Sequence, residues 1–332
     1  MAPALLRPCL RRPMLALLFC LTAVVSFILG VCVSVVILEP DRAALRSSAA
    51  QRQVSDGPGY MLAVLVLTAP DNAERRAAMR ATWLRPRGGA SPPARHWFVL
   101  GGASLPPGQR VQLAAEQARH GDLLLLPDVA DAYGRLTDKV LAAFAWLAGH
   151  ARHRYALKCD DDTFARLGPL LDELAAAPRS RFYLGFFDGR ARPQRSGKWA
   201  EPAWDLCDTY LPYALGGGYV ISSDLVAHLA ASAPLLRRFG SEDVSMGAWL
   251  APLDVTRRHE PRFDTEYMSR GCDNRYLVTH KQSAAQMAEK QRTLESRGVL
   301  CEREHRTRSS YIYNWTVPAS HCCKRTDDRT VP

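Results

Sequence analysis

The chain has 332 residues, of which 47% are hydrophobic and 23% are charged, a composition that excludes a wholly disordered protein. Its formal net charge of +10 admits nucleic acid, an anionic membrane surface or an acidic glycan as a partner. The basic residues are scattered, however, and no compact Lys/Arg block with interleaved aromatics, zinc finger or helix-turn-helix signature occurs. We therefore expect no nucleic-acid partner and interpret the excess charge as a solvated basic surface.

An uncharged apolar run covers residues 14–38. It is longer than a signal-peptide core, and a bilayer-spanning helix needs about 20 apolar residues. Arg7, Arg11 and Arg12 precede it, so the N-terminus is expected on the cytosolic side. The alternative is a buried core helix of a soluble protein. The predicted order is a cytosolic tail (1–13), a transmembrane signal anchor (14–38), a stem (39–58) and a luminal catalytic domain (59–332).

The predicted luminal part holds six cysteines, in a compartment where disulfides persist. The sequence does not choose among the possible pairings. Cys159 falls in a strand pattern and can be a small buried apolar residue, in which case at least one other thiol is also free. No CxxC pair occurs, which argues against structural zinc. The six are Cys159, Cys207, Cys272, Cys301, Cys322 and Cys323.

Strand and helix patterns alternate after the stem, beginning with the apolar run MLAVLVLT and a helix that Asp71 or Asn72 can cap. This alternation predicts βαβ units and one α/β domain with a mainly parallel sheet. The expected strands are 61–68, 96–100, 122–126 and 155–159. The expected helices are 73–84, 109–120, 136–148, 224–230, 242–250 and 283–293.

Three consecutive carboxylates, Asp160, Asp161 and Asp162, follow the apolar strand RYALKC. Ligands of open α/β sheets bind beyond the carboxyl ends of strands. The three charges repel one another unless a cation neutralises them, and oxygen ligands favour Mn²⁺ or Mg²⁺. Asp160 and Asp162 point the same way in an extended turn, so one ion can meet both. The alternative is a solvated acidic turn.

Such an ion would hold a diphosphate, as in a nucleotide-sugar, and an inverting sugar transfer then needs a carboxylate base. Glu242 and Asp243, within SEDVSMGAWL, are candidates at the start of a predicted helix. The structural alternative is a first helical turn that is capped by Ser241 and carries acids that favour the helix dipole.

Five ordered motifs resemble those of the β1,3-glycosyltransferases of glycosyltransferase family 31, over residues 61 to 323. GDLLLLP, APLDV, RFDTEY and YLVTHKQS resemble, more narrowly, the galactosyltransferases that build the linkage region of proteoglycans. The five motifs are AERRAAMRATW (73–83), DAYGRLTDKVL (131–141), KCDDDTF (158–164), YALGGGYV (213–220) and SEDVSMGAWL (241–250).

This resemblance implies a GT-A fold, which is a Rossmann-like mixed sheet flanked by helices. It implies that Asp162, together with Asp160, binds Mn²⁺ and that Asp161 lies near the uridine ribose. In related enzymes a late histidine completes the metal shell. The motif assigns that role to His280, with His259 as the rival.

The resemblance also assigns further roles. Arg76 and Arg80 would line the donor site, although a solvated helical face explains them as well. Asp243 would be the catalytic base, supported by Glu242. The three glycines at 216–218 would let the backbone pass close to a ligand, with a plain tight turn as the alternative.

Four aromatic residues between the motifs are candidates for an acceptor site, because aromatic faces stack on the apolar faces of sugars. Core packing explains each of them equally well. The four are Trp199, Trp204, Tyr210 and Tyr213. Asn314-Trp315-Thr316 is a sequon that can be glycosylated in the secretory lumen.

The resemblance implies a type II Golgi membrane enzyme that transfers galactose from UDP-galactose to O3 of galactose in Galβ1,4-xylose on a proteoglycan core protein. One alternative is another β1,3-transferase that uses N-acetylglucosamine or N-acetylgalactosamine as the donor sugar. The other is a non-catalytic Golgi glycan-binding protein on the same fold, which is expected to have lost one of the acidic groups.

Overall fold

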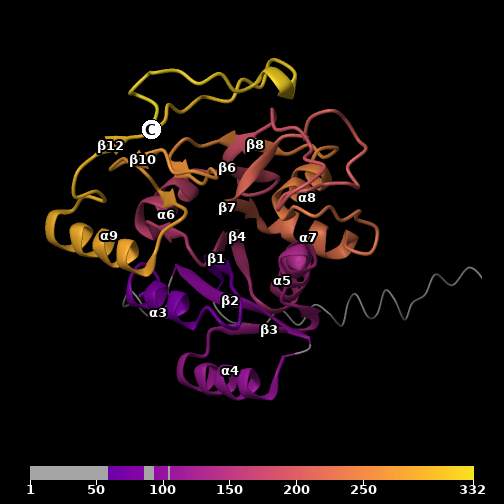
Figure 1. Cartoon of the computed structure of the whole chain (residues 1–332), viewed down its shortest axis with the longest axis vertical. Coiled ribbons are helices and arrows are strands. Elements are labelled where there is room, and N and C mark those ends of the chain that lie inside the picture. Colours follow the sequence, from indigo (N-terminus) through magenta and orange to yellow (C-terminus); the bar gives the residue numbers. More distant parts are fainter. Residues whose placement is uncertain (1–58, 86–92, 104) are drawn as a thin grey trace, which may run out of the picture. The chain divides into compact units, whose positions relative to one another are not determined.

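A seven-stranded sheet lies at the centre of the protein, in the order β3-β2-β1-β4-β7-β6-β8 (Figure 1). The computed structural model describes residues 59–85, 93–103 and 105–332. These belong to one compact unit, Val54–Pro332. The strands of the sheet are β1 (Tyr60–Leu67), β2 (Ala94–Ala103), β3 (Leu123–Ala130), β4 (His153–Asp160), β6 (Phe182–Asp188), β7 (Tyr213–Ser222) and β8 (Thr256–His259).

The sheet is mainly parallel, which confirms the predicted mixed α/β class. Strands β3, β2, β1 and β4 run parallel, as do β6 and β8. Strand β7 is antiparallel to both β4 and β6. The run MLAVLVL in β1 is almost entirely buried, because a central parallel strand is covered on both faces.

The helices surround this sheet. Helices α5, α7 and α8 pack together, and α3 packs with α9 (Figure 1). They are α3 (Ala73–Ala81), α4 (Pro107–His120), α5 (Leu136–His150), α6 (Leu167–Ala175), α7 (Ser223–Ser232), α8 (Glu242–Leu250) and α9 (Ala284–Arg297), with short 3-10 helices η1 (Tyr133–Arg135) and η2 (Ala319–His321).

Two smaller sheets complete the second half of the chain. The first brings β11 beside β5 and β9, and the second pairs β10 with β12. Their bounds are β5 (Phe164–Ala165), β9 (Phe263–Asp264), β10 (Gly271–Cys272), β11 (Val278–Thr279) and β12 (His305–Arg306).

The predicted elements appear with shifted ends. Helix α3 ends at Ala81 rather than at 84, and strands β6 and β7 were not predicted as such. Asn72 occupies the N-cap position of α3 but makes no capping bond, because its side chain binds Asp161 instead. Ser241 likewise precedes α8 without a side-chain cap bond.

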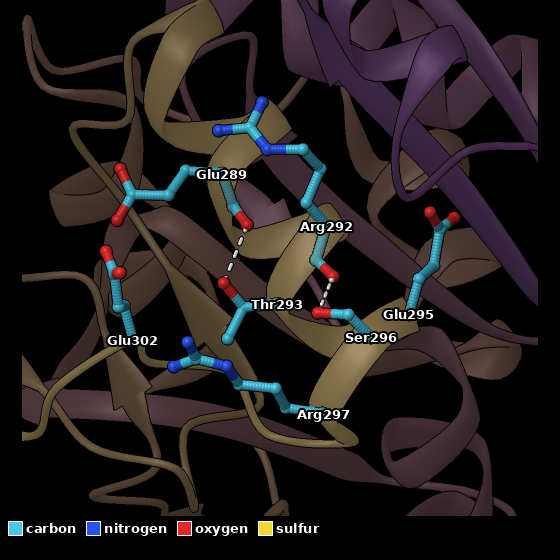
Figure 2. A pocket seen from close by; sticks show the side chains of 7 residues that line it. All are labelled: Glu289, Arg292, Thr293, Glu295, Ser296, Arg297 and Glu302. Carbon is cyan, nitrogen blue, oxygen red and sulfur yellow. Dashed lines mark hydrogen bonds between the residues drawn. The ribbon is translucent and has the colours of Figure 1, made fainter.

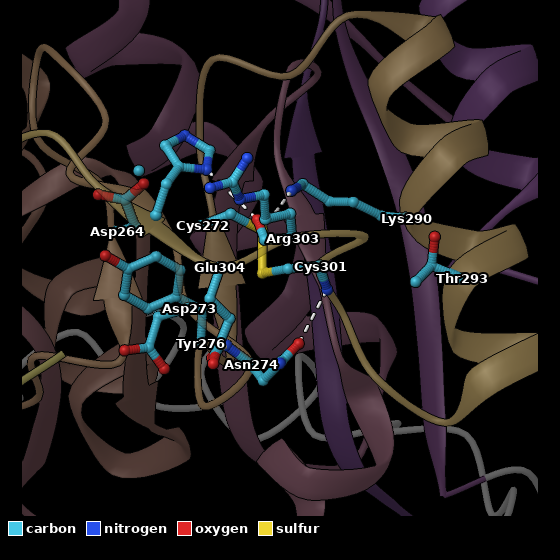
Figure 3. Close-up of a disulfide and its surroundings, with 12 residues drawn as sticks. Asp264, Cys272, Asp273, Asn274, Tyr276, Lys290, Thr293, Cys301, Arg303 and Glu304 are labelled. Carbon is cyan, nitrogen blue, oxygen red and sulfur yellow. Dashed lines mark hydrogen bonds between the residues drawn. A yellow bond between two sulfur atoms is a disulfide. The ribbon is translucent and has the colours of Figure 1, made fainter.

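The cysteines of the described part divide between disulfides and free thiols. Cys159 is buried and free, as the strand pattern allowed, and the exposed Cys207 is the second free thiol. The disulfides are Cys272–Cys301, drawn in Figure 3, and Cys322–Cys323.

Residues 14–38, the predicted membrane anchor, lie outside the described residues, as do the tail and the stem. Within residues 59–85, 93–103 and 105–332, no helix has the length and apolar character needed to span a bilayer.

Candidate active site

Two carboxylates and an imidazole converge at the end of β4. Asp160 is the last residue of β4, and His280 follows β11 directly. Nε2 of His280 lies 2.8 Å from Oδ1 of Asp162 and 3.4 Å from Oδ2 of Asp160. One potential ligand atom from each of the three residues lies within 4.8 Å of the other two. The structure thus brings together the three residues that the sequence singled out as metal ligands.

Asp160, Asp162 and His280, called the triad below, have the chemistry of a divalent-cation site. Oδ1 of Asp162 is buried and, within the described residues, accepts no well-aligned hydrogen bond. Nε2 of His280 lies 2.8 Å away but is not aligned for a hydrogen bond, and a cation would satisfy the buried oxygen. Two carboxylate oxygens and one imidazole nitrogen are a donor set that suits Mn²⁺. The residues present therefore fit the implied ion.

Strand β7 passes unusually close to the triad. A Cβ atom placed on Gly217 would lie 2.4 Å from Nδ1 of His280. The Thr163 hydroxyl donates a hydrogen bond of 2.7 Å to the carbonyl of Gly217 and holds the strand there. Glycines 216–218 lie within β7, so the tight-turn interpretation is wrong. The absence of side chains lets the backbone approach functional groups.

Asp161, the middle carboxylate, points into a separate cluster of donors. Its Oδ2 accepts hydrogen bonds from Thr68 Oγ1 and Asn72 Nδ2, both at 2.7 Å. Its Oδ1 accepts a bond of 2.8 Å from Nη1 of Arg75. The carboxylate is buried and fastens β4 to the segment between β1 and α3. Its expected position near a ribose stays a prediction.

The two arginines expected at the donor site form an ion-pair network inside the protein. Arg76 is fully buried, and its Nη2 lies 2.7 Å from Glu116. Arg80 binds Asp122 through two contacts of 2.8 Å and also reaches Glu116. These contacts join α3 to α4 and to the start of β3, so the solvated-face interpretation is wrong. The donor-site role of both arginines stays a prediction.

Their neighbour Arg75 points to the acidic residues instead. Its side chain is 48% exposed, and Nη1 lies 2.8 Å from Asp161 and 3.8 Å from Asp162. No motif or spacing in the sequence distinguishes Arg75 from its neighbours. Of the arginines in α3, it is therefore the one with a partly exposed cation at the triad.

Asp243, the predicted base, lies in the first turn of α8 and faces β7. Its Oδ2 accepts the backbone N–H of Gly216 at 2.9 Å, and its Oδ1 accepts that of Val244 at 2.9 Å. Burial and, to a lesser extent, the negative charge of Glu242 raise the pKa of Asp243 to about 6. A carboxylate with this pKa is mostly ionised at neutral pH and is a better proton acceptor than an ordinary aspartate.

A buried lysine connects the triad with α8. Nζ of Lys158 lies 3.0 Å from Oδ1 of Asp160, 2.8 Å from Oε2 of Glu242 and 2.7 Å from the carbonyl oxygen of Gly216. Burial opposes its charge, but the two carboxylates outweigh burial and raise its pKa above the ordinary value. Glu242 also accepts a hydrogen bond from Tyr219. The sequence signal for this residue was a lysine within an otherwise apolar strand.

His259, the rival metal ligand, has a structural role in β8. The backbone N–H of Phe187 donates to its Nδ1 at 3.0 Å, and its Nε2 lies 2.9 Å from the carbonyl oxygen of Tyr311. Burial lowers the pKa of His259 to about 4, so the ring is neutral at physiological pH. Both ring nitrogens are therefore used, and the geometry favours His280 over His259.

Of the four aromatic acceptor candidates, three are core residues. Trp204, Tyr210 and Tyr213 pack with Phe239 in a small second core and are nearly inaccessible. Trp199, in contrast, is 45% exposed. Core packing therefore accounts for three of the four, and only Trp199 presents its ring to solvent.

A surface hollow of about 550 Å³ lies along α9, away from these groups (Figure 2). Its lining includes Arg292, Thr293 and Ser296 of α9 and Glu302 beyond it, and shares no residue with the triad. The hydroxyls of Thr293 and Ser296 donate to carbonyls within their own helix, which leaves them little capacity for a ligand. Of the two places, the triad is therefore the candidate for the reactive centre.

Comparison with known proteins shows the family to which the chain belongs. The galactosyltransferase family model matches residues 74–261, a range that includes Asp160, Asp162 and Asp243. β-1,3-Galactosyltransferase 6 of Mus musculus is 55% identical over 271 residues, which cover 80% of this chain and 82% of the mouse protein.

More distant relatives share smaller parts. Hydroxyproline O-galactosyltransferase GALT2 of Arabidopsis thaliana is 32% identical over 75% of this chain and 37% of its own length. UDP-GalNAc:β-1,3-N-acetylgalactosaminyltransferase 2 of Danio rerio is 32% identical over 58% of this chain and 38% of its own. The solved galactosyltransferase LgtC, at 12% identity, gives a TM-score of 0.34 over 68% of this chain and 94% of LgtC, too low to support a conclusion. On the family match and the mouse relative, the chain belongs to the galactosyltransferase family.

Proposed function

We propose that this glycosyltransferase is an inverting β1,3-galactosyltransferase that uses UDP-galactose as its donor and has the GT-A arrangement. The observation that carries the proposal is the contact chain from the triad to the base. Lys158 touches Asp160 and the carbonyl of Gly216, whose N–H in turn binds Asp243. A diphosphate-binding centre and a proton acceptor thus lie side by side, as inverting transfer requires.

Asp160, Asp162 and His280 would hold Mn²⁺, which when bound would neutralise charge on the leaving diphosphate. Asp243 takes the proton from the acceptor hydroxyl. An electron pair on the deprotonated acceptor oxygen then forms the new bond to the anomeric carbon of galactose, on the face opposite the diphosphate. The bond from that carbon to the diphosphate oxygen breaks, and UDP leaves with its electrons. Arg75 adds a positive charge on the donor side.

Lys158 and Glu242 position these groups. The buried ammonium of Lys158 fixes Asp160 on one side and Glu242 on the other. The charge of Glu242 contributes to the raised pKa of Asp243. Asp243 is therefore both held in place, by the N–H of Gly216, and made more basic.

For the acceptor, we propose Galβ1,4-xylose on a proteoglycan core protein, with transfer to O3 of the galactose. The name of the mouse relative supports the sugar and the linkage, and the motif resemblance supports the xylose-linked acceptor. The zebrafish relative supports the rival, an N-acetylgalactosamine donor. A non-catalytic relative is expected to have lost one of Asp160, Asp162 and Asp243, and this chain has all three.

For the location, we propose the Golgi membrane in single-pass type II orientation, with residues 59–332 in the lumen. The support comes from the uncharged run at 14–38 and from the three arginines before it.

A donor screen tests the proposed function. The full chain, purified in detergent, is incubated with a Galβ1,4-xyloside and with UDP-galactose, UDP-N-acetylglucosamine or UDP-N-acetylgalactosamine. Each reaction is run with MnCl₂ and with EDTA. We expect manganese-dependent transfer from UDP-galactose alone and a β1,3 linkage in the product by NMR. Preferred transfer of an N-acetylhexosamine would establish the rival donor, and no transfer from any donor would overturn the enzymatic assignment.

A further inference from the structure

Two exposed aromatic rings meet beside the reactive centre from distant parts of the chain. Tyr133 lies on η1, and Trp199 lies in the long connection between β6 and β7. They are 49% and 45% exposed, respectively. Tyr267 and Trp315 are exposed to a similar degree, but Tyr133 and Trp199 are the pair that shares a lysine. Exposed aromatic side chains that lie together often mark a binding surface.

A lysine joins the two rings into one surface. Nζ of Lys198 lies 5.0 Å from the ring centroid of Tyr133 and 5.8 Å from that of Trp199. We call Tyr133, Lys198 and Trp199 the aromatic platform. It offers two ring faces, a hydroxyl and an ammonium group to solvent.

The backbone fixes this platform at the carboxyl end of the sheet. Asp131, two residues before Tyr133, pairs with the buried Lys139. Lys139 in turn donates to the carbonyl oxygen of Thr68, and the preceding residue, Leu67, pairs with Asp160 across β1 and β4. The segment 131–139 therefore holds Tyr133 near the carboxyl ends of β1 and β4, where Asp160 of the triad lies.

Electrostatics agree with this placement. Burial, and then the charge of Asp243, raise the pKa of the Tyr133 hydroxyl, and Asp160 adds to the effect. The Tyr133 hydroxyl therefore lies close enough to Asp243 and Asp160 for their charges to act on it.

We propose that the aromatic platform is the acceptor subsite and binds a neutral pyranose. The apolar face of the sugar stacks on Trp199, and the hydroxyl of Tyr133 and the ammonium of Lys198 bond to its hydroxyl groups. This inference rests on the proposed function, because it places the acceptor so that one of its hydroxyls faces Asp243.

The experiment compares Trp199→Ala, Tyr133→Phe and Lys198→Gln with the wild type as full chains in detergent. The KM for a Galβ1,4-xyloside, the KM for UDP-galactose and the acceptor-free hydrolysis of UDP-galactose are measured. We expect Trp199→Ala to raise the acceptor KM about tenfold, the equivalent of one lost stacking contact. We expect smaller rises for the other two variants. The donor KM and the hydrolysis rate should stay at wild-type values.

A matched control exists at the opposite end of the sheet, where the parallel strands begin. The guanidinium of Arg95 lies 6.0 Å from the ring centroid of Tyr60 and 5.1 Å from that of Trp97, near the amino ends of β1 and β2. This is the same combination of cation, tyrosine and tryptophan. Arg95→Gln should leave all three kinetic readouts unchanged.

The outcomes separate this inference from the proposed function. Wild-type acceptor KM values in all three platform variants would overturn the subsite and leave the galactosyltransferase assignment standing. If the wild type transfers no galactose, the proposed function fails. The subsite is then judged by saturation-transfer NMR of the xyloside with wild type and Trp199→Ala. Weaker binding by the variant would support the subsite, whereas equal binding or none to either protein would overturn it.

Discussion

Gly217 and His280 fit together so closely that glycine is the only residue that leaves room for the imidazole. A Cβ atom at position 217 would lie 2.4 Å from Nδ1 and 2.5 Å from Cγ of His280. Both elements are held elsewhere, since Thr163 bonds to the Gly217 carbonyl and the His280 N–H donates to Asp264. Neither element can move easily, so the position of the proposed third metal ligand depends on the absence of a side chain at residue 217.

Gly217→Ala should therefore displace His280 and weaken metal binding. We expect the Mn²⁺ concentration for half-maximal activity to rise at least about tenfold, since ligand misplacement of this kind typically weakens metal affinity 10- to 100-fold. Titration of Mn²⁺ against transfer rate measures the change. Gly149→Ala is the control, because a Cβ there meets no atom within 4 Å. An unchanged Mn²⁺ requirement in Gly217→Ala would show that the strand yields to the methyl group.

The two histidines provide a second, independent comparison. His280→Ala removes a ligand atom from the triad and should raise the Mn²⁺ requirement. His259→Ala removes two buried hydrogen bonds and should lower the free energy of unfolding by about 1–3 kcal/mol. Its Mn²⁺ requirement should match the wild type. If His259→Ala raised the Mn²⁺ requirement and His280→Ala did not, His259 would be the metal ligand in place of His280.

Asp243 should control both activity and the pH dependence of stability. Asp243→Asn removes the base and should lower kcat by about 10²- to 10⁴-fold with little change in UDP binding. Because the base must be ionised, wild-type kcat/KM should rise with pH through about 6. For folding, a carboxyl pKa raised from 3.8 to about 6 favours the native state when protonated.

That stability is present below pH 4 and is lost as pH rises through about 6. Asp243→Asn should therefore raise the Tm at pH 7.5 and have little effect at pH 4, where the wild-type carboxyl is already neutral. Thermal unfolding of both proteins at pH 7.5 and at pH 4 measures the difference in Tm. A lower Tm for the variant at pH 7.5 would contradict the buried, destabilising charge assigned to Asp243.

Lys158→Met should destabilise the fold as well as the site. Its removal leaves the buried carboxylate of Glu242, and Asp160 beside it, without their shared cation. Breaking a buried ion pair on one side typically costs about 3–5 kcal/mol. We expect a loss of that size in urea unfolding. Lys324→Met, at an exposed lysine, should change stability by less than about 0.5 kcal/mol. Near-wild-type stability of Lys158→Met would contradict the stabilising role assigned to this buried ion pair.

The strands and helices in the first half of the domain were predicted from local patterns, because long apolar runs and helical spacing there match the observed elements. Strand β7 was not, since a run of three glycines is typical of a turn. It is extended because the side chains of Asp243, His280 and Val278 come from elsewhere to fill the space over the glycines. Those contacts are long-range and leave no trace in the local sequence.

The site was predictable to a similar degree. Asp160 and Asp162 follow from their position after a strand, whereas His280 was reached only through resemblance, because β11 brings it in from far along the chain. The spacing of Arg76 and Arg80 correctly put them on one helical face. That face packs on Glu116 of α4, and Arg75, on an adjacent face of α3, meets the carboxylates. Which face of a helix meets the ligand is decided by packing, which spacing alone does not reveal.

The disulfide of Figure 3 joins Cys272 to Cys301, and His280 lies inside the loop that it closes. Next to the bond, the backbone N–H of Cys301 donates to Asn274 at 2.9 Å, so both ends of the loop are secured. The imidazole is therefore delivered to the carboxylates by a segment whose ends are covalently tied. Reduction of this disulfide would remove that covalent tie. We therefore expect the position of His280 relative to Asp160 and Asp162 to be less well defined in a chain whose Cys272 and Cys301 are reduced.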